Sequence, residues 1–483
     1  MASLGKRLRR WLYLGHRWLG ILTCLFFAVW FVSGGVMMYV GFPRLTEAER
    51  RAALPSLDWD RVALTPEAAL DRAGLAAGEA QRITLSMLAD LPVYRIVPWD
   101  GATRTVAATD GHVIAGLDVA QALAVAASHP AARAPVALGP VERDQWTVHQ
   151  RFDPARPFHR IALGDAAGTE LYIARATGEI VLDTTRHERF WNWFGAIPHW
   201  IYFTPIRAQR DLWRDVVLWL SGIGIAGAVT GLTVGLIRFR LRRRYARGAV
   251  TPYRGWMRWH HLGGLVAGTA VLTFIVSGWL SMNPNRWFSA QGPDRAAQGR
   301  YAGPADRPFG LDRSALAQSC PDAREARFTR LDGRPGVILA CADGRFQPCC
   351  AEGARPTLAA ITASARRLIP EASPPEVVLI AREDAYWYGH HSERRLPVLR
   401  IAFADPAATW FHIDPATGEI LGRLDRSDRL SRWLFNGLHS LDIGLLIRHR
   451  PAWDAVMLLL LLGGLLVSVS GIVIGWRRLA RPL

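Results

Sequence analysis

Four histidines occupy matched positions in the two halves of this 483-residue chain. His16 and His260 lie 244 residues apart, and each precedes a long apolar stretch. His199 and His439 lie 240 residues apart, and each comes shortly before another such stretch. Placing a polar ring beside a membrane span costs free energy, so such a residue usually has a function. Because neutral imidazole is the commonest side-chain metal ligand, these four residues are candidate ligands.

The histidines belong to a longer internal repeat, which two ungapped self-alignments reveal. At an offset of 244 residues, the shared positions include His16, Gly20, Val32, Ser33, Gly34 and Met38, which recur as His260, Gly264, Val276, Ser277, Gly278 and Met282. At an offset of 240 residues, they include 176–180, Trp193, His199, Arg210, Trp213, Gly231 and Arg238, which recur as 416–420, Trp433, His439, Arg450, Trp453, Gly471 and Arg478. This pattern indicates that the chain consists of two copies of one structural unit.

Four uncharged stretches of about 20 residues are long enough to cross a bilayer. They lie at 18–39, 216–237, 262–282 and 456–476. The formal net charge of +17 is concentrated beside them, because residues 1–17, 238–258 and 475–483 hold five, eight and three Lys or Arg and no Asp or Glu. By the positive-inside rule, these segments and both termini are cytoplasmic. The rest of the chain is nearly neutral, which argues against a nucleic-acid partner.

The predicted fold is a membrane protein with four transmembrane α-helices in two tandem pseudo-symmetric repeats, each with an outward α+β domain. Period-3.6 patterns predict helices at 117–128 and 357–370, and alternating residues predict a hairpin at 158–182. The predicted boundaries are a cytoplasmic segment with the first span at 1–42, the first outward domain at 43–212, the second span at 213–238, a basic cytoplasmic loop at 239–258, the third span at 259–282, the second outward domain at 283–452, the fourth span at 453–476 and a cytoplasmic tail at 477–483.

Both copies run in the same direction, so their pseudo-twofold axis lies along the membrane normal and repeated residues face each other. We call His16 and His260, beside the basic segments, the inner pair. We call His199 and His439, at the other membrane face, the outer pair. Two neutral imidazoles facing each other in an apolar bundle form the ligand set of a bis-histidine haem. The sequence therefore predicts two haems at two depths, which together form a path for electrons.

Two alternatives stay open for these histidines. They could be interfacial residues that bond to lipid headgroups or backbone. Repeat symmetry also permits His16 to pair with His439 and His260 with His199, although the charge distribution places the members of those pairs at different depths. His261, beside the third-span ligand candidate, has no histidine counterpart and is predicted to be interfacial.

The outward segments hold weaker candidates. His149 aligns near His390 and His391, and these side chains could contact a substrate or its metal, although a surface-loop role is simpler. The second outward segment also holds four cysteines: Cys320, Cys341, Cys349 and Cys350. An even number in an oxidising compartment predicts one or two structural disulfides. Three pairings are open, and a redox or metal role is the alternative.

Several of these segments resemble one family, the PepSY-associated transmembrane (PepSY-TM) proteins. The resemblance lies in residues 15–39, in the ATGEI hairpins, and in HWIYF at 199–203 and LHSLD at 438–442, and it covers nearly the whole chain. It implies a bacterial inner-membrane location with periplasmic α+β domains, b-type haem bound by the four histidines, and activity as a ferric-siderophore reductase. Two departures are the cysteines of the second outward segment and LHSLD, which stands where the first copy has PHWIY.

The implied chemistry is reduction of chelated iron. Siderophores hold Fe(III) with hard oxygen donors that bind Fe(II) far more weakly, so one electron releases the metal. A chelate is expected to dock between the outward domains, and the electron donor could be a quinol or a cytoplasmic reductase. The alternative function is a membrane-anchored PepSY binding or regulatory module without redox activity. A permease is disfavoured because the spans contain no charged residue.

Overall fold

The computed structural model describes residues 2–288, 294–349, 355–390 and 394–480. The chain divides into two compact units, which are described separately. The helical unit comprises Met1–Phe42, Phe190–Ser289 and Asp428–Leu483, and the sheet unit comprises Pro43–Arg189 and Ala290–Ser427. Each unit therefore combines segments from both halves of the sequence.

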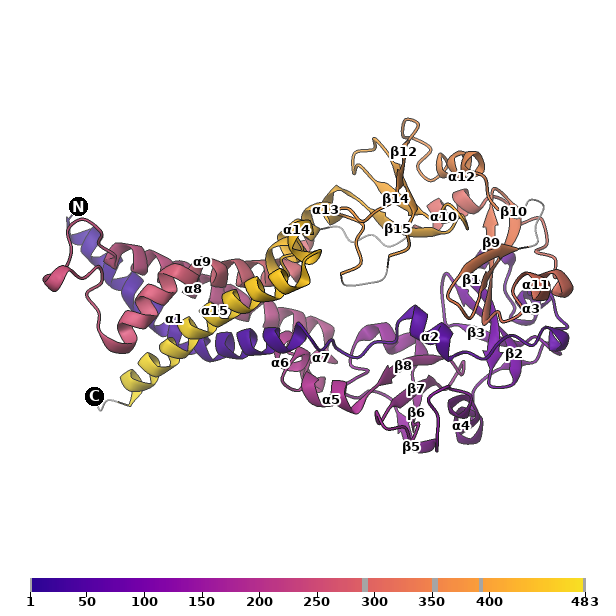
Figure 1. Ribbon diagram of the computed structural model, residues 1–483, viewed down its shortest axis with the longest axis horizontal. Helices are drawn as coiled ribbons and strands as arrows, with labels where there is room; N and C mark the ends of the chain where they lie inside the picture. Colours follow the sequence, from indigo (N-terminus) through magenta and orange to yellow (C-terminus); the bar gives the residue numbers. More distant parts are fainter. Residues whose placement is uncertain (1, 289–293, 350–354, 391–393, 481–483) are drawn as a thin grey trace. The chain divides into compact units, whose positions relative to one another are not determined.

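Four long helices make up most of the helical unit (Figure 1): α1 (Ala2–Met37), α8 (Arg210–Arg238), α9 (Gly255–Ser281) and α15 (Arg450–Leu479). α1 packs against α8 and α15, and α9 packs against the same two helices. The prediction of four helices long and apolar enough to cross a membrane is confirmed. Each helix extends beyond its predicted apolar stretch, because flanking arginines can keep their charged ends in water while the backbone stays helical. His16 therefore lies well inside α1.

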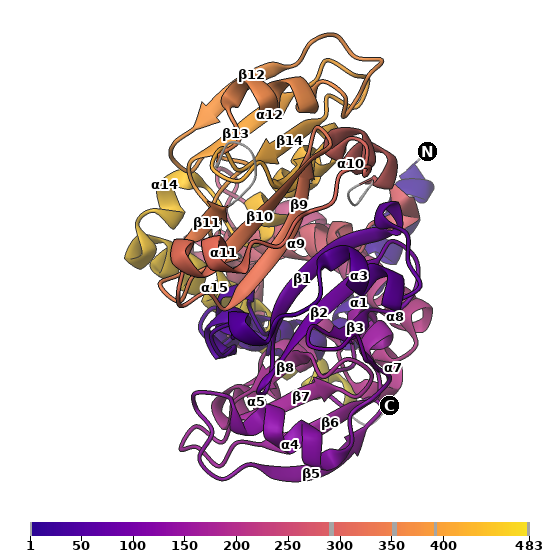
Figure 2. The ribbon, with the colours of Figure 1, turned by 90° about the vertical axis from the view of Figure 1, so that its right-hand side faces the viewer.

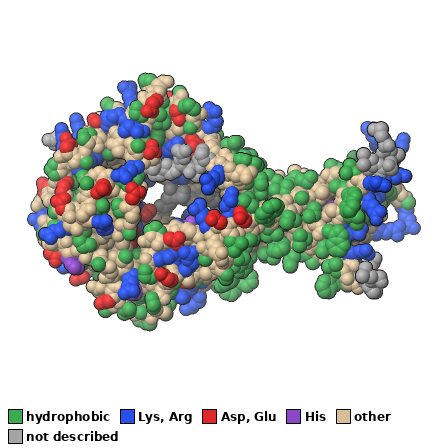
Figure 3. Space-filling model, turned by 180° about the vertical axis from the view of Figure 1, so that it is seen from behind, with side chains coloured by type: hydrophobic (Ala, Val, Ile, Leu, Met, Phe, Trp, Pro, Cys, Tyr) green, Lys and Arg blue, Asp and Glu red, His purple; other side chains and the backbone are tan. Residues whose placement is uncertain are grey.

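The outer faces of these helices are apolar. Large hydrophobic side chains are exposed on all four, among them Leu25, Trp219, Val266 and Leu459. Figure 3 shows many hydrophobic side chains on the helical unit, with Lys and Arg gathered at one end of it. So much exposed apolar surface is unfavourable in water and favours contact with lipid chains. The helical unit thus has the surface of a membrane protein.

Short helical segments precede α8 and α15. Those before α8 are α5 (Arg186–Asn192), α6 (Ala196–Trp200) and α7 (Thr204–Arg207), and those before α15 are α13 (Arg426–Arg432), the π-helical η6 (Trp433–Gly437) and α14 (Gly444–Ile447). Two 3-10 turns, η4 (Ala246–Gly248) and η5 (Pro284–Arg286), flank α9. The chain turns through Ile201 and Leu441, whose φ values are 54° and 50°. Positive φ is rare for such residues, so each turn is sterically constrained.

The described part of the sheet unit contains three antiparallel sheets. The largest has the strand order β11-β10-β9-β1-β2-β3-β4, which Figure 2 shows edge to edge. Its strands are β1 (Ala80–Leu88), β2 (Leu91–Pro98), β3 (Arg104–Ala107), β4 (Val113–Ile114), β9 (Glu325–Leu331), β10 (Arg334–Ala340) and β11 (Phe346–Cys349). The four-stranded sheets are β5 (Val136–Val141), β6 (Phe158–Ala162), β7 (Glu170–Ala174) and β8 (Ile180–Thr184), and β12 (Glu376–Ile380), β13 (Val398–Ala402), β14 (Trp410–Ile413) and β15 (Ile420–Leu424).

Short helices complete the α+β architecture of this unit. They are α2 (Glu47–Ala53), α3 (Pro66–Arg72), α4 (Val119–Ala127), α10 (Arg295–Ala302), α11 (Arg313–Ser319) and α12 (Leu358–Ala365), with the 3-10 turns η1 (Trp59–Arg61), η2 (Ala77–Glu79) and η3 (Gln150–Ala155). α4 packs on β5 and β6, and α12 packs on α10 and β9. The helices predicted at 117–128 and 357–370 are therefore present as α4 and α12.

Strands from the two halves of the sequence share the seven-stranded sheet. β1 pairs with β9, which places Ile83 opposite Phe328. One hydrophobic core then contains Leu85, Tyr94 and Phe328, with Leu85 and Tyr94 fully buried. The sequence predicts one outward domain in each half, and this sheet takes strands from both. Pairing β1 with β9 satisfies backbone groups that two separate sheets would leave on exposed edges.

A buried carboxylate also joins the two halves of the sheet unit. Glu325 on β9 is 1% exposed, and its side-chain oxygens lie 2.5 Å from Arg50 on α2 and 3.0 Å from Arg327. Arg327 also reaches Glu419 at 2.6 Å. Burial alone would raise the pKa of Glu325, but the charges of Arg50 and Arg327 outweigh it and lower this pKa to about 2.

Glu325→Gln is expected to lower the free energy of unfolding by about 3–5 kcal/mol, because it leaves buried arginines without their counter-charge. Since the folded-state pKa lies below the usual value of 4.5, this stabilisation is complete above about pH 4.5 and is lost as the pH falls toward 2. Denaturant unfolding of the purified chain at several pH values measures both effects. Glu47→Gln is the control, since Glu47 also pairs with Arg50 but is 60% exposed. Equal destabilisation by both variants would contradict the prediction.

Candidate functional site

The inner pair lies side by side in the helical unit. His16 is on α1 and His260 is on α9, and their ring centres are 6.2 Å apart with ring planes at 29°. Both rings line a cavity of about 940 Å³ between the four long helices. The histidines therefore come together as His16 with His260, and not in the alternative pairing that repeat symmetry permits.

Each inner ring is anchored through Nδ1 to a neighbouring helix. His16 Nδ1 lies 3.2 Å from the carbonyl oxygen of Gly227 on α8. His260 Nδ1 lies 3.1 Å from the carbonyl oxygen of Val467 on α15 and 3.1 Å from Ser470 Oγ. A carbonyl oxygen only accepts hydrogen bonds, so each ring carries its hydrogen on Nδ1. The Nε2 lone pair is then available to a metal ion.

The outer pair has similar spacing and a different ring angle. His199 on α6 and His439, which follows η6, have ring centres 6.1 Å apart and ring planes at 71°. Burial is the main cause that lowers the pKa of His199 to about 3 and that of His439 to about 4. Both rings are therefore neutral at pH 7, which is the protonation state that binds metals.

Matching hydrogen bonds anchor the two outer rings to the spans. His199 Nδ1 donates to the carbonyl oxygen of Trp30 at 3.2 Å and to Ser33 Oγ at 3.1 Å, both on α1. The acceptors of His439 Nδ1 are the matched residues of α9, the carbonyl oxygen of Phe274 at 3.1 Å and Ser277 Oγ at 3.0 Å. Each serine hydroxyl itself donates to a carbonyl oxygen in its own helix, so its oxygen is free to accept from the imidazole. All four histidines thus present Nε2 rather than Nδ1 for ligation.

A glycine lies against the Cε1 atom of every one of these rings. The four contacts are Gly231 with His16, Gly471 with His260, Gly34 with His199 and Gly278 with His439. A Cβ atom at Gly231 would lie 2.6 Å from His16 Cε1, closer than real contacts allow, and a Cβ at each of the other three would lie 3.4 Å from its ring. Small residues therefore permit the helices to approach the rings closely.

The spacing of each pair fits one metal ion between two axial imidazoles. An imidazole nitrogen binds a metal at about 2 Å and lies about 1 Å from its own ring centre, so two axial rings have centres about 6 Å apart. The observed separations of 6.2 Å and 6.1 Å agree with this requirement. Backbone acceptors on the second ring nitrogen are the usual means of fixing a metal-binding histidine. Each pair could therefore hold the metal ion of a flat macrocycle.

The walls of the inner cavity suit such a flat, apolar ligand. Its lining residues include the glycines Gly20, Gly227, Gly231, Gly235, Gly255, Gly264, Gly268, Gly471 and Gly475. Apolar side chains such as Phe27 and Val271 also line it. Glycine has no side chain to fill the space between helices, so these positions leave a slot beside the two imidazoles.

His261 lines the same cavity but has no nitrogen available for a metal. Its Nδ1 lies 2.8 Å from Thr251 Oγ1, and its Nε2 lies 2.9 Å from the carbonyl oxygen of Gly235. The ring is buried, with 7% exposed. Its role is to hold the loop before α9 against α8, since both of its hydrogen bonds reach outside its own helix.

The other predicted histidines lie in the sheet unit. His149 Nδ1 accepts a hydrogen bond from the backbone N–H of Arg151 at 2.9 Å, so His149 caps η3. His390 is half-buried, and His391 lies outside the described residues. The geometry therefore gives His149 a local structural role.

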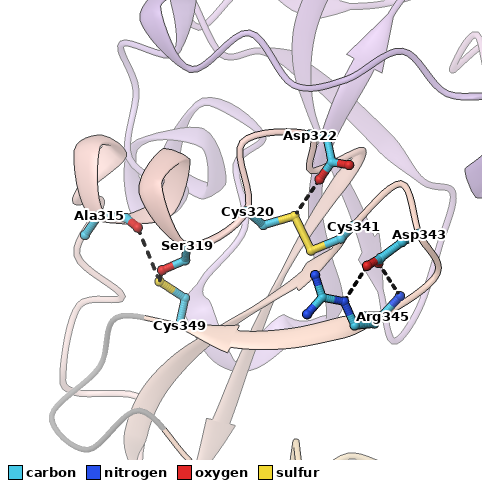
Figure 4. Close-up of a disulfide and its surroundings, with 8 residues drawn as sticks. All are labelled: Ala315, Ser319, Cys320, Asp322, Cys341, Asp343, Arg345 and Cys349. Atoms are coloured by element: carbon cyan, nitrogen blue, oxygen red, sulfur yellow. Dashed lines mark hydrogen bonds and ion pairs between the residues drawn. A yellow bond between two sulfur atoms is a disulfide. The ribbon is translucent and has the colours of Figure 1, made fainter.

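A disulfide lies at the start of the second outward segment's sheet strands (Figure 4). Cys320 and Cys341 are bonded, with their Cα atoms 6.1 Å apart, which selects one of the three possible pairings. Cys349 Sγ lies 2.9 Å from Ser319 Oγ, and Cys350 lies outside the described residues. Asp322, Cys320 and Cys341 lie close enough together to suggest a metal site. However, a sulfur binds a metal as a thiolate, and two sulfurs bonded to each other are not thiolates. The disulfide therefore favours the structural interpretation of this pair.

No family model and no curated protein matches this chain. The candidate site therefore rests on its own geometry.

Sequence reasoning missed the Nδ1 acceptors, which lie on other helices than the histidines they anchor. The signal was partly present, since Ser33 and Ser277 are repeated at the same offset as the inner pair. Gly231 and Gly471 are likewise repeated.

Proposed function

We propose that this chain is a haem-containing electron-transfer protein of a bacterial inner membrane, resembling PepSY-TM proteins, which reduces ferric iron in siderophore complexes. One observation carries the proposal. Two pairs of imidazoles have ring centres 6.2 Å and 6.1 Å apart, and every Nδ1 is bonded to a backbone carbonyl. A histidine that only supports the fold does not need a second imidazole at this distance, and here two pairs have it.

Each pair would hold one b-type haem, the inner pair through His16 and His260 and the outer pair through His199 and His439. Haem iron with two axial imidazoles supplies one-electron oxidation and reduction without an open position for oxygen. The chain's own residues would hold the imidazoles rigidly and keep water out of the site. Hydrogen bonds to α1, α8, α9 and α15 fix the imidazole planes, and the surrounding apolar side chains exclude water.

The two pairs are placed to span most of a bilayer. Along α1, His16 and Ser33, the contact of the outer pair, are 17 residues apart, or about 25 Å at 1.5 Å per residue. The hydrocarbon core of a bilayer is about 30 Å thick. The rings of Phe31 and Phe274 are 6.3 Å apart and lie beside the outer pair, since Phe274 is 5.7 Å from His439. This arrangement suits electron transfer across the membrane.

The substrate proposed for the outer side is a ferric siderophore in the periplasm. One electron, which a quinol or a cytoplasmic reductase would supply, converts the bound Fe(III) to Fe(II), a softer and less charged ion that hard oxygen ligands hold far more weakly. The iron is therefore released without breaking the chelator. The sheet unit would lie on this side, with the termini in the cytoplasm.

The first test is the visible spectrum of the detergent-purified chain, oxidised and then reduced with dithionite, with haem measured as the pyridine haemochrome. We expect a low-spin b-type spectrum and about two haems per chain. A colourless protein from cells supplied with haem would contradict the proposal. It would favour a membrane-anchored binding module without redox activity.

A further inference from the structure

The inner cavity has a strongly basic lining. Five arginines line it: Arg17, Arg238, Arg254, Arg477 and Arg478. Among the described residues that line the cavity, none is Asp or Glu. None of these arginines forms an ion pair with a described carboxylate. Like charges that converge without a counter-charge repel one another, so the lining favours an anionic ligand.

Two of these arginines are related by the internal repeat, and each lies on the same helix as a glycine that contacts an inner histidine. Arg238 lies seven residues after Gly231, and Arg478 lies seven residues after Gly471. Seven residues are two helical turns, so each arginine shares a helix face with its glycine, about 10.5 Å along the axis. Gly231 and Gly471 are the glycines that contact the inner histidines. The two arginines therefore occupy equivalent positions, Arg238 on α8 and Arg478 on α15, and both helices pack against α1 and α9.

Arg238 gives a second, independent indication. Its guanidinium carbon lies 4.9 Å from the centre of the Tyr13 ring, which holds the side chain in place. Its Nε atom is buried and has no hydrogen-bond partner, while the rest of the guanidinium group forms a hydrogen bond with Tyr13. A buried donor without an acceptor is destabilising, so a ligand that supplies an acceptor would bind here favourably.

We propose that Arg238 and Arg478 bind the two carboxylates of the macrocycle held by the inner pair, an inference that rests on the proposed function. A b-type haem carries both propionate carboxylates on one edge. Guanidinium groups form strong, bidentate hydrogen bonds with carboxylates. The carboxylate edge of the inner haem therefore faces the basic end of the helical unit. Anionic phospholipid headgroups offer the same chemistry, and the experiment below separates the two sources.

The test compares haem b with its neutral dimethyl ester. A His199→Ala background leaves only the inner site, and the haem-depleted protein is titrated with each compound. The unaltered arginines are expected to bind haem b at least tenfold more tightly than the ester, since one charge-assisted hydrogen bond contributes that much. Arg238→Gln with Arg478→Gln is expected to abolish this preference. The control is Arg242→Gln with Arg243→Gln, which removes the same charge from exposed residues outside the cavity lining.

The outcomes separate this inference from the proposed function. The inference would be overturned if the Arg238→Gln, Arg478→Gln protein still preferred haem b over the ester. It would also be overturned if this protein lost co-purified anionic phospholipid while its preference for haem b stayed unchanged. Binding of haem b and the ester with equal affinity by the unaltered arginines would also overturn it, while leaving haem ligation intact. If the glutamine variant does not fold, Arg238→Lys with Arg478→Lys keeps the charge and should retain part of the preference. Failure of the unaltered chain to bind haem would contradict the proposed function itself.

Discussion

Replacing His199 or His439 with alanine is expected to reduce the haem content from about two per chain to about one and to abolish reduction of ferric siderophores. Each variant removes one of the two imidazoles that would hold the haem, and the remaining imidazole alone is not expected to retain it. His16→Ala and His260→Ala are expected to remove the other haem. The pyridine haemochrome gives the haem content, and the absorbance of Fe(II) captured by a ferrous chelator gives the rate of iron reduction.

The ring angles should reveal which haem each variant has lost. The ring planes meet at 29° in the inner pair and at 71° in the outer pair. Nearly parallel axial rings separate the energies of the iron d orbitals more than nearly perpendicular rings do. Two different low-spin electron paramagnetic resonance signals are therefore expected, and the outer-pair variants should lose the one with the larger maximum g value.

Two controls make the histidine experiment decisive. His112→Ala replaces an exposed histidine of the sheet unit and is expected to leave the haem content unchanged. Free imidazole, added together with haem, is small enough to enter the vacated space and should restore both the haem content and the low-spin spectrum, which a purely structural role for the histidine would not predict. Iron reduction that survives loss of the outer haem would exclude the proposed route to the chelate.

Gly231→Ala is expected to eliminate the inner haem while leaving the outer one bound. The added Cβ would lie 2.6 Å from His16 Cε1 and 3.1 Å from its Nδ1. The ring cannot retreat without giving up its hydrogen bond to Gly227, one turn earlier on the same helix. We therefore expect a displaced imidazole and a haem content of about one per chain, measured as above.

Gly222→Ala is the matched control for this substitution. Gly222 lies on the same helix, and a Cβ there would have no heavy atom within 4 Å. Alanine is also the better helix former, so this variant is expected to keep both haems and at least its original stability. A Gly231→Ala protein with two haems and an unchanged spectrum would show that His16 is not held against α8 as described.

Several features of the protein follow from the amino-acid sequence alone. Uncharged stretches of the length of a bilayer core predict the four long helices, because membrane length and hydropathy are local properties. The constant offsets of 244 and 240 residues place His16 with His260 and His199 with His439 at equivalent positions. Hairpin and helix patterns in the outward segments likewise depend on neighbouring residues and are present in the structure.

The tertiary structure decided how these elements meet. Periodicity does not specify how packed helices are rotated about their axes. This rotation determines which ring His16 or His439 faces and which carbonyl oxygen accepts its hydrogen bond. His261 illustrates this point, since only the packing of α9 against α8 and the preceding loop occupies both of its nitrogens. The pairing of Cys320 with Cys341 and of β1 with β9 joins residues distant in the chain. Such contacts are selected by the combined packing of many side chains, so no single segment of the sequence encodes them.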